Sequence, residues 1–293
     1  MKPLLLFFIF VIFSFAAHAG HSNESPTDTL KTDTTVVKKR IRFKFELSAS
    51  SNNTYQGRQD TSHIPIITPL FRYTTKRRFY FETCLVKQGE GKKPFDEWDI
   101  TLGKRFVFSD KWSLRMAYTH YFFDSQVSRI TASVKNYFST SLNYDWKILY
   151  SQLRFSWSGG NDQFTYKSKK VNTKTNDFNF TFANSRQFDI NDVLKKGFYL
   201  TLTPEVDILY GTQNYLTTYK GKGDKTNKTY SNQVSKFALT AYSFSFDVAY
   251  TMNKFTIDLT PYYTIPMNTP SGESSSPYFV MTASVYYIFS GKK

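Results

Sequence analysis

Charged side chains recur at alternate positions in segments that are otherwise apolar and aromatic. The segment 41–47 reads IRFKFEL, so Arg42, Lys44 and Glu46 share one face of an extended strand whose other face is apolar. A strand with one face in lipid and the other in water can form the wall of a transmembrane barrel. The charged residues are therefore candidates for lining a lumen, where the chemistry open to them is the filtering of polar solutes and ions.

The same alternation assigns charged or phenolic residues to the inward face of most other strands, with basic residues mainly on early strands and acidic residues on late ones. Two interpretations remain open. In one, a basic wall faces an acidic wall across a water-filled channel; in the other, the charges form an ion-pair network that plugs a narrow barrel. The predicted lumen-lining residues are Arg42, Lys44, Glu46, Arg78, Tyr80, Glu82, Asp99, Arg105, Arg115, Arg154, Glu205, Asp207, Asp247 and Asp258.

Catalytic chemistry has less support in the sequence. Barrel lipid hydrolases place a histidine and a serine two residues apart on one strand, so that base and nucleophile share a face. His63 and His120, the two histidines beyond the N-terminal region, have no serine at that spacing. The histidines and the cysteine also lack metal-ligand spacing. We therefore predict no catalytic residues, no metal site and no cofactor.

The element that best fits a membrane-spanning wall is the segment 277–289, PYFVMTASVYYIF. It is apolar at every second residue, and a transmembrane strand needs about ten residues. Val285, Tyr287 and Phe289 end its apolar face. We expect these three residues to act as the C-terminal signal through which the barrel assembly machinery recognises the chain.

Upstream segments show the same alternation and predict an all-β fold, a transmembrane antiparallel β-barrel of about twelve strands. Pro65 and Pro69 argue for an edge strand or a loop at 66–73, and a count of ten strands stays open. Long extracellular loops and short periplasmic turns are typical of such barrels. We expect tight turns near 75, 110, 146 and 253 and a somewhat longer connection at 190–196 on the periplasmic side. On the other side we expect long connections at 52–65, 122–136, 159–175, 212–234 and 265–276, and the shortest at 88–96.

The N-terminal region has a different composition from the strands. Residues 1–19, MKPLLLFFIFVIFSFAAHA, predict a secretory signal peptide with an A-x-A cleavage site at the end. Residues 20–40 are rich in Ser, Thr, Asp and Lys without apolar periodicity, which indicates a flexible periplasmic tail. The transmembrane barrel is expected to occupy 41–290.

Composition is consistent with a barrel in a Gram-negative envelope. The 293 residues carry a formal net charge of +15, and the mean hydropathy is −0.43. A barrel tolerates low hydropathy, because half of each strand faces a polar lumen. No nucleic-acid motif accompanies the positive charge, so we expect outer-membrane lipid and lipopolysaccharide, or an anionic solute, as its counterpart. The single cysteine, Cys84, excludes an internal disulfide.

Several segments carry a resemblance to a known group of proteins. LTPEVDILYGTQNY from Leu202, PYYTIPMN (261–268) and SSSPYFVMTASVYYIF (274–289) resemble porin-type outer-membrane β-barrels common in Bacteroidota-type genomes. The resemblance covers most of 97–290. It implies the bacterial outer membrane as location and a barrel as fold.

Three functions are consistent with these observations. The resemblance and the alternating charges favour a porin-like channel for passive diffusion of small polar solutes or ions. The alternative is a closed structural barrel that partners another envelope protein. A third interpretation, an outer-membrane lipid hydrolase, would need a nucleophile beside a base. The sequence leaves solute selectivity and oligomeric state open.

Overall fold

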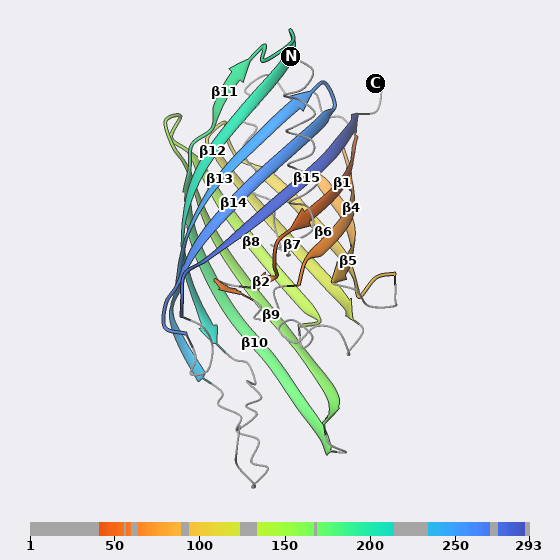
Figure 1. Cartoon of the computed structure of the whole chain (residues 1–293), viewed down its shortest axis with the longest axis vertical. Coiled ribbons are helices and arrows are strands. Elements are labelled where there is room, and N and C mark those ends of the chain that lie inside the picture. The colour runs from red at the N-terminus through yellow and green to blue at the C-terminus, as the bar shows by residue number, and fades with distance from the viewer. Residues whose placement is uncertain are drawn as a thin grey trace.

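Alternating apolar and polar residues form long antiparallel strands in the computed structural model (Figure 1). The structure describes residues 41–55, 57–59, 64–88, 94–123, 134–166, 169–213, 234–269 and 275–290. Within these ranges, twelve strands make a closed barrel: β1 (Arg42–Ser50), β4 (Ile66–Thr74), β5 (Phe79–Gln88), β6 (Glu97–Val107), β7 (Trp112–Phe123), β8 (Asn136–Asp145), β9 (Tyr150–Tyr166), β10 (Lys169–Ser185), β12 (Phe198–Gln213), β13 (Val234–Met252), β14 (Phe255–Pro266) and β15 (Tyr278–Ser290).

The barrel closes where its first strand pairs with its last. β1 pairs antiparallel with β15, from Arg42 opposite Ser290 to Ser50 opposite Thr282. Every other neighbouring pair is also antiparallel. A closed barrel leaves no unpaired edge in the wall, which a strand structure in lipid requires. The predicted fold is therefore confirmed with twelve strands rather than ten.

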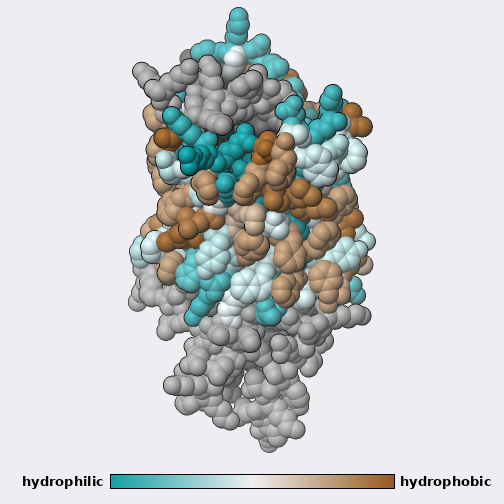
Figure 2. Space-filling view, turned by 180° about the vertical axis from the view of Figure 1, so that it is seen from behind, coloured by the Kyte–Doolittle hydropathy of each residue, from teal (hydrophilic) through white to brown (hydrophobic). Residues whose placement is uncertain are grey.

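Most buried side chains are polar or charged, and many large apolar side chains are exposed. On β1, Phe45 and Leu47 are exposed while Lys44 is buried. Figure 2 shows apolar side chains spread around the middle of the visible face of the barrel. This inversion of the usual pattern of soluble proteins is the pattern of a transmembrane barrel. Within the described ranges, no helix is long and apolar enough to cross a membrane.

Short turns lie at one end of the barrel, the end at which β15 stops (Figure 1). The connections at 75–78, 108–111, 146–149 and 253–254 have the predicted short lengths. By the asymmetry of outer-membrane barrels, this is the periplasmic end. The opposite end carries the long connections and is the extracellular end.

Aromatic side chains gather near the turns. Phe43 packs on Tyr73 and Phe289, and Trp112 packs on Tyr144. Amphipathic rings at this depth form the interfacial girdle of a membrane barrel. Lys104, the one charged residue on the apolar face of β6, lies here, with Nζ 4.2 Å from the centre of the Phe79 ring. A cation–π contact and interfacial water explain its place on the outer wall.

Prolines mark the interruptions of three strand ladders. The β4–β5 pairing skips the residues beside Pro69, and the β13–β14 pairing skips those beside Pro261. The β10–β12 pairing stops beside Pro204 and resumes in the same register as β11 (Phe188–Asn191) paired with β12. Proline has no N–H to donate to the neighbouring strand, which accounts for each gap. The predicted connection at 190–196 is thus partly a strand that extends the periplasmic rim (Figure 1).

Two predicted extracellular loops are wrong in part. Residues 159–175, expected to be a loop, belong mainly to β9 and β10, whose ladder continues to Tyr166 opposite Lys169. These strands form a long hairpin beyond the barrel wall (Figure 1). The loop 52–65 contains a small hairpin of β2 (Thr54–Tyr55) and β3 (Arg58–Gln59). Both segments are mainly polar in sequence, so alternation of apolar residues could not reveal these hairpins.

Other predictions fall partly or wholly outside the described residues. The signal peptide 1–19 and the periplasmic tail 20–40 lie outside them entirely. So does most of the predicted loop 212–234. These segments remain predictions from the sequence.

Candidate functional site: the barrel lumen

A cavity of about 130 Å³ lies inside the barrel, between β1, β4–β8, β14 and β15. Most of its lining residues are polar or charged, and Ile66, Leu70 and Ala117 are among the apolar ones. Seven of the predicted residues line it: Lys44, Glu46, Tyr80, Glu82, Asp99, Arg115 and Asp258. The other seven predicted residues do not line this cavity: Arg42, Arg78, Arg105, Arg154, Glu205, Asp207 and Asp247.

One predicted position differs from the expected geometry. Arg78 does not lie within a strand but in the turn before β5, with a φ of 63°. The alternation of Tyr80 and Glu82 does not extend back to Arg78, because Arg78 is the last residue of the turn 75–78. Its backbone carbonyl accepts a hydrogen bond from the Arg105 N–H at 3.1 Å.

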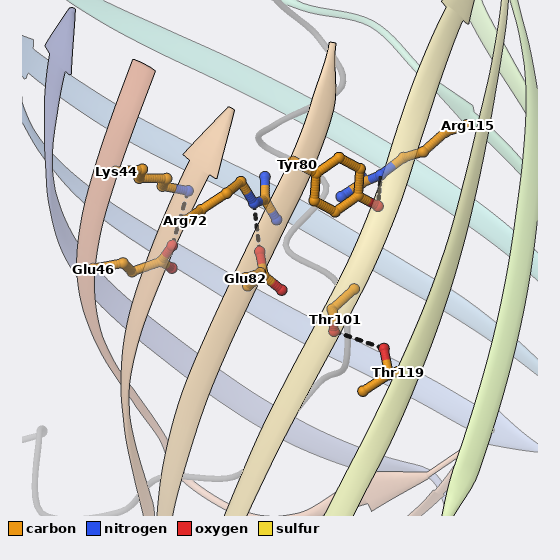
Figure 3. Close-up of polar contacts among 8 residues, drawn as sticks. All are labelled: Lys44, Glu46, Arg72, Tyr80, Glu82, Thr101, Arg115 and Thr119. Atoms are coloured by element: carbon orange, nitrogen blue, oxygen red, sulfur yellow. Dashed lines mark hydrogen bonds and ion pairs between the residues drawn. The ribbon is translucent and has the colours of Figure 1, made fainter. Parts of the chain in front are cut away.

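On the wall formed by β1, β4 and β5, basic residues are paired with acidic ones (Figure 3). Lys44 Nζ lies 2.8 Å from a carboxylate oxygen of Glu46, on the same strand. Arg72 forms a short ion pair with Glu82, which is its direct cross-strand neighbour. Charges taken partly out of water are stable when they are paired in this way. Sequence reasoning missed Arg72, because Pro69 cast doubt on its strand.

Tyr80 connects this ion-paired wall to β7. Arg115 Nε donates a hydrogen bond to the Tyr80 hydroxyl at 3.1 Å (Figure 3). The guanidinium carbons of Arg72 and Arg115 lie 5.3 and 5.2 Å from the centre of the Tyr80 ring. Gly103 makes room for the ring, since a Cβ there would lie 2.2 Å from Tyr80 Cζ. A glycine within a strand is therefore a signal for a side chain packed flat on the lumen wall.

The wall formed by β12, β13 and β14 is acidic. Thr260 Oγ1 lies 2.8 Å from a carboxylate oxygen of Asp247 and 2.9 Å from one of Asp258. A hydroxyl has one proton, so it can donate to only one of these carboxylates at a time. Arg154 on β9 acts electrostatically on Glu205 and Asp207 from two strands away along the same wall. Across the closed barrel, β13 and β14 lie opposite β6 and β7, so the acidic wall faces Arg105 and Arg115.

Several buried polar atoms in the lumen have no hydrogen-bond partner among the described residues. They include Asp99 Oδ1, Arg105 Nε, the Tyr150 hydroxyl and Asp258 Oδ2. Buried polar groups in native proteins are satisfied by protein or by ordered water. Because these atoms belong to a polar interior with a cavity, water is the partner that the geometry favours.

Cys84 gives the lumen a single thiol. Its Sγ donates a hydrogen bond to Asp99 Oδ2 at 3.1 Å, and the residue is 7% exposed. Cys84 lines the cavity and is the only cysteine of the chain. It is therefore a unique chemical handle inside the barrel.

The β2–β3 hairpin covers part of the inner wall near the extracellular end. Gly57, at the turn of this hairpin, packs so closely on β13 that a Cβ there would lie 2.4 Å from Ala241 Cβ. Its φ of 80° is also one that glycine adopts most easily. Ala241 is fully buried beneath this contact. The hairpin thus reaches from β1 to β13 and narrows the mouth of the barrel.

The residues weighed for catalysis have other contacts. His120 Nδ1 lies 3.0 Å from Asn136 Oδ1, and its ring packs edge-on against Phe122. These contacts hold the ring beside the extracellular aromatic residues. His63 lies outside the described residues. Among the residues that the structure describes, no group of three His, Cys, Asp or Glu side chains could hold a metal ion.

No family model and no curated protein matches this sequence. Among solved structures, the NanC porin has a TM-score of 0.48 at 10% identity, with 83% of this chain and 98% of that chain covered. The KdgM porin has a TM-score of 0.46 at 7% identity, covering 84% and 98%. The COG4313 outer membrane channel from Pseudomonas putida F1 scores 0.42 at 9% identity, covering 85% and 94%. Likeness at this level does not transfer a solute or an activity.

Location follows from the architecture of the molecule itself. The barrel is closed, its exterior is apolar and aromatic, and its interior is polar and charged. Only closed barrels let strands cross lipid with every backbone group paired, and barrels of this kind belong to outer membranes. The protein is an outer-membrane β-barrel.

Proposed function

We propose that the protein is a porin-like channel for passive diffusion of small polar solutes or ions across the outer membrane. The observation that carries this proposal is the lumen: a cavity lined by charged and hydroxyl side chains, beside buried polar atoms that need water as a partner. A hydrated interior offers a polar solute a path that the lipid does not.

The distribution of charge supports passage of small, charged or dipolar solutes. Arg105 and Arg115 lie on β6 and β7, and Asp247 and Asp258 lie on β13 and β14, across the closed barrel from them. Charges fixed on opposite walls create a transverse field that orients a dipole as it passes. The small cavity and the β2–β3 hairpin favour solutes of low molecular mass.

Membrane assembly involves the outer wall of the same barrel. Val285, Tyr287 and Phe289 are exposed on the outer face of β15. Their exposure is consistent with recognition by the barrel assembly machinery before insertion and with contact to membrane lipid and lipopolysaccharide afterwards. The tail 20–40 would extend into the periplasm.

A closed structural barrel that partners another envelope protein is the second candidate. The ion pairs Lys44–Glu46 and Arg72–Glu82 favour it, because they hold long side chains in fixed positions inside the lumen. The two functions differ in whether solutes cross a membrane that contains the protein alone.

A liposome-swelling assay separates these functions. Liposomes with the refolded full-length barrel are diluted into isotonic glycine, arabinose or a trisaccharide. We expect rapid swelling in glycine, slower swelling in arabinose and none in the trisaccharide, because the lumen is narrow and polar. Liposomes with an equal amount of heat-unfolded protein are the control. Absence of swelling with a correctly folded barrel would contradict the channel and favour the structural barrel.

A further inference from the structure

Two arginines lie directly opposite each other inside the periplasmic half of the barrel. Arg105 on β6 pairs with Arg115 on β7 in the strand register. Like charges at directly opposite positions destabilise an antiparallel pair. Arg78 lies next to them, since its carbonyl accepts the Arg105 backbone N–H. Three consecutive elements of the wall thus bring three guanidinium groups to one region.

The surroundings of Arg105 differ from those of the other lumen cations. Lys44 and Arg72 each contact a carboxylate, that of Glu46 and Glu82 respectively. The cations Arg115, Arg78 and Arg42 instead lie close enough to act electrostatically on Arg105, as does the phenol of Tyr150. Positive charges gathered in this way create a positive potential that attracts anions.

Hydrogen-bond donors in the same region are available for that anion. Arg105 Nε and the Tyr150 hydroxyl are buried and have no hydrogen-bond partner among the described residues. The second Arg105 donor group, Nη2, makes only a long contact of 3.4 Å with Ser113 Oγ. Guanidinium forks match the oxygen geometry of phosphate and carboxylate groups. The unused donors therefore point to an oxyanion.

We propose that Arg78, Arg105 and Arg115, together with Tyr150, form a binding site for an oxyanion, with phosphate as its simplest form. The proposal deepens the channel function by naming a class of solute, small molecules that carry a phosphate group. Bound phosphate relieves the repulsion between the opposed arginines and accepts the unused hydrogen bonds. Because the site faces the lumen, its ligand is a soluble anion and not a headgroup of the surrounding lipid.

The test uses thermal unfolding of the full-length barrel in lipid-free detergent, with inorganic phosphate or chloride at equal ionic strength. Phosphate at a tenfold excess over its Kd should raise the Tm by about 3 °C. Arg105→Gln should abolish this shift. Without phosphate, Arg105→Gln should unfold at the same temperature as the wild type or a higher one, because it removes repulsion.

Matched variants make the result specific. Lys104→Gln removes one positive charge from the outward face of the same strand, and it should keep the full phosphate shift. Arg105→Lys keeps the charge but loses the fork, and it should keep a reduced shift. Equal stabilisation of the wild type and Arg105→Gln, or no stabilisation of the wild type, would overturn the proposal. Since binding is measured without current or flux, its failure is distinguishable from failure of the channel function.

Discussion

The double variant Asp247→Asn/Asp258→Asn should make the channel less selective for cations. The two carboxylates lie on the acidic wall and share the hydroxyl of Thr260. Their charge attracts cations and repels anions, and neither effect survives in the amide. We expect the cation-to-anion permeability ratio to fall by about threefold to tenfold, as Coulomb energies near water predict. Reversal potential under a potassium chloride gradient measures this ratio.

Controls separate this effect from altered folding. Asparagine keeps the size of aspartate and can accept the Thr260 hydrogen bond, so the barrel should fold normally. Arg105→Gln/Arg115→Gln, which removes cations from the other wall, should shift the reversal potential in the opposite direction. An ion-pair plug would show no current in either variant. Shifts of the same sign in both variants would contradict walls of opposite charge.

Removal of the β2–β3 hairpin should increase the single-channel conductance. In this variant a two-glycine linker replaces Thr54–Gln59. Gly57 holds the hairpin against Ala241 on β13, so its removal uncovers the inner wall near the mouth. We expect the conductance to rise roughly twofold, because the narrowest part of a pore controls its conduction.

A deletion of equal length elsewhere is the control for this variant. The hairpin of β9 and β10 extends beyond the barrel wall, with Tyr166 paired with Lys169 near its tip. Removal of six residues there should leave the conductance unchanged. If both deletions changed conductance equally, or if the β2–β3 deletion left it unchanged, the hairpin would not narrow the passage.

The barrel wall could be predicted from sequence because the strand period is two and lipid imposes an apolar face. This constraint is strong for β1 and β15, where one face alternates cleanly. It also located β4, although Pro69 suggested a loop; the ladder skips two positions at the proline and then continues in register. The constraint is lost beyond the membrane. The outer parts of β9 and β10 are polar, so their pairing left no pattern to detect.

The lumen was harder to predict than the wall. Alternation placed Lys44, Tyr80 and Asp258 at the cavity, but it could not indicate which charges pair. The Arg72–Glu82 contact depends on the register between β4 and β5, which no single strand reveals. The opposed arginines Arg105 and Arg115 depend on register in the same way. Packing of the β2–β3 hairpin depends on a contact between Gly57 and Ala241 on β13, far apart in sequence.

The central claim, an open and hydrated lumen, is tested most directly by single-channel current with a cationic thiol reagent. Cys84 is the only cysteine of the chain and lines the cavity. We predict steady conductance steps that fall when the reagent adds bulk and positive charge at Cys84, and steps that do not change in Cys84→Ser. A folded barrel without conductance steps would contradict the account. So would unchanged steps after mass spectrometry shows that Cys84 is modified.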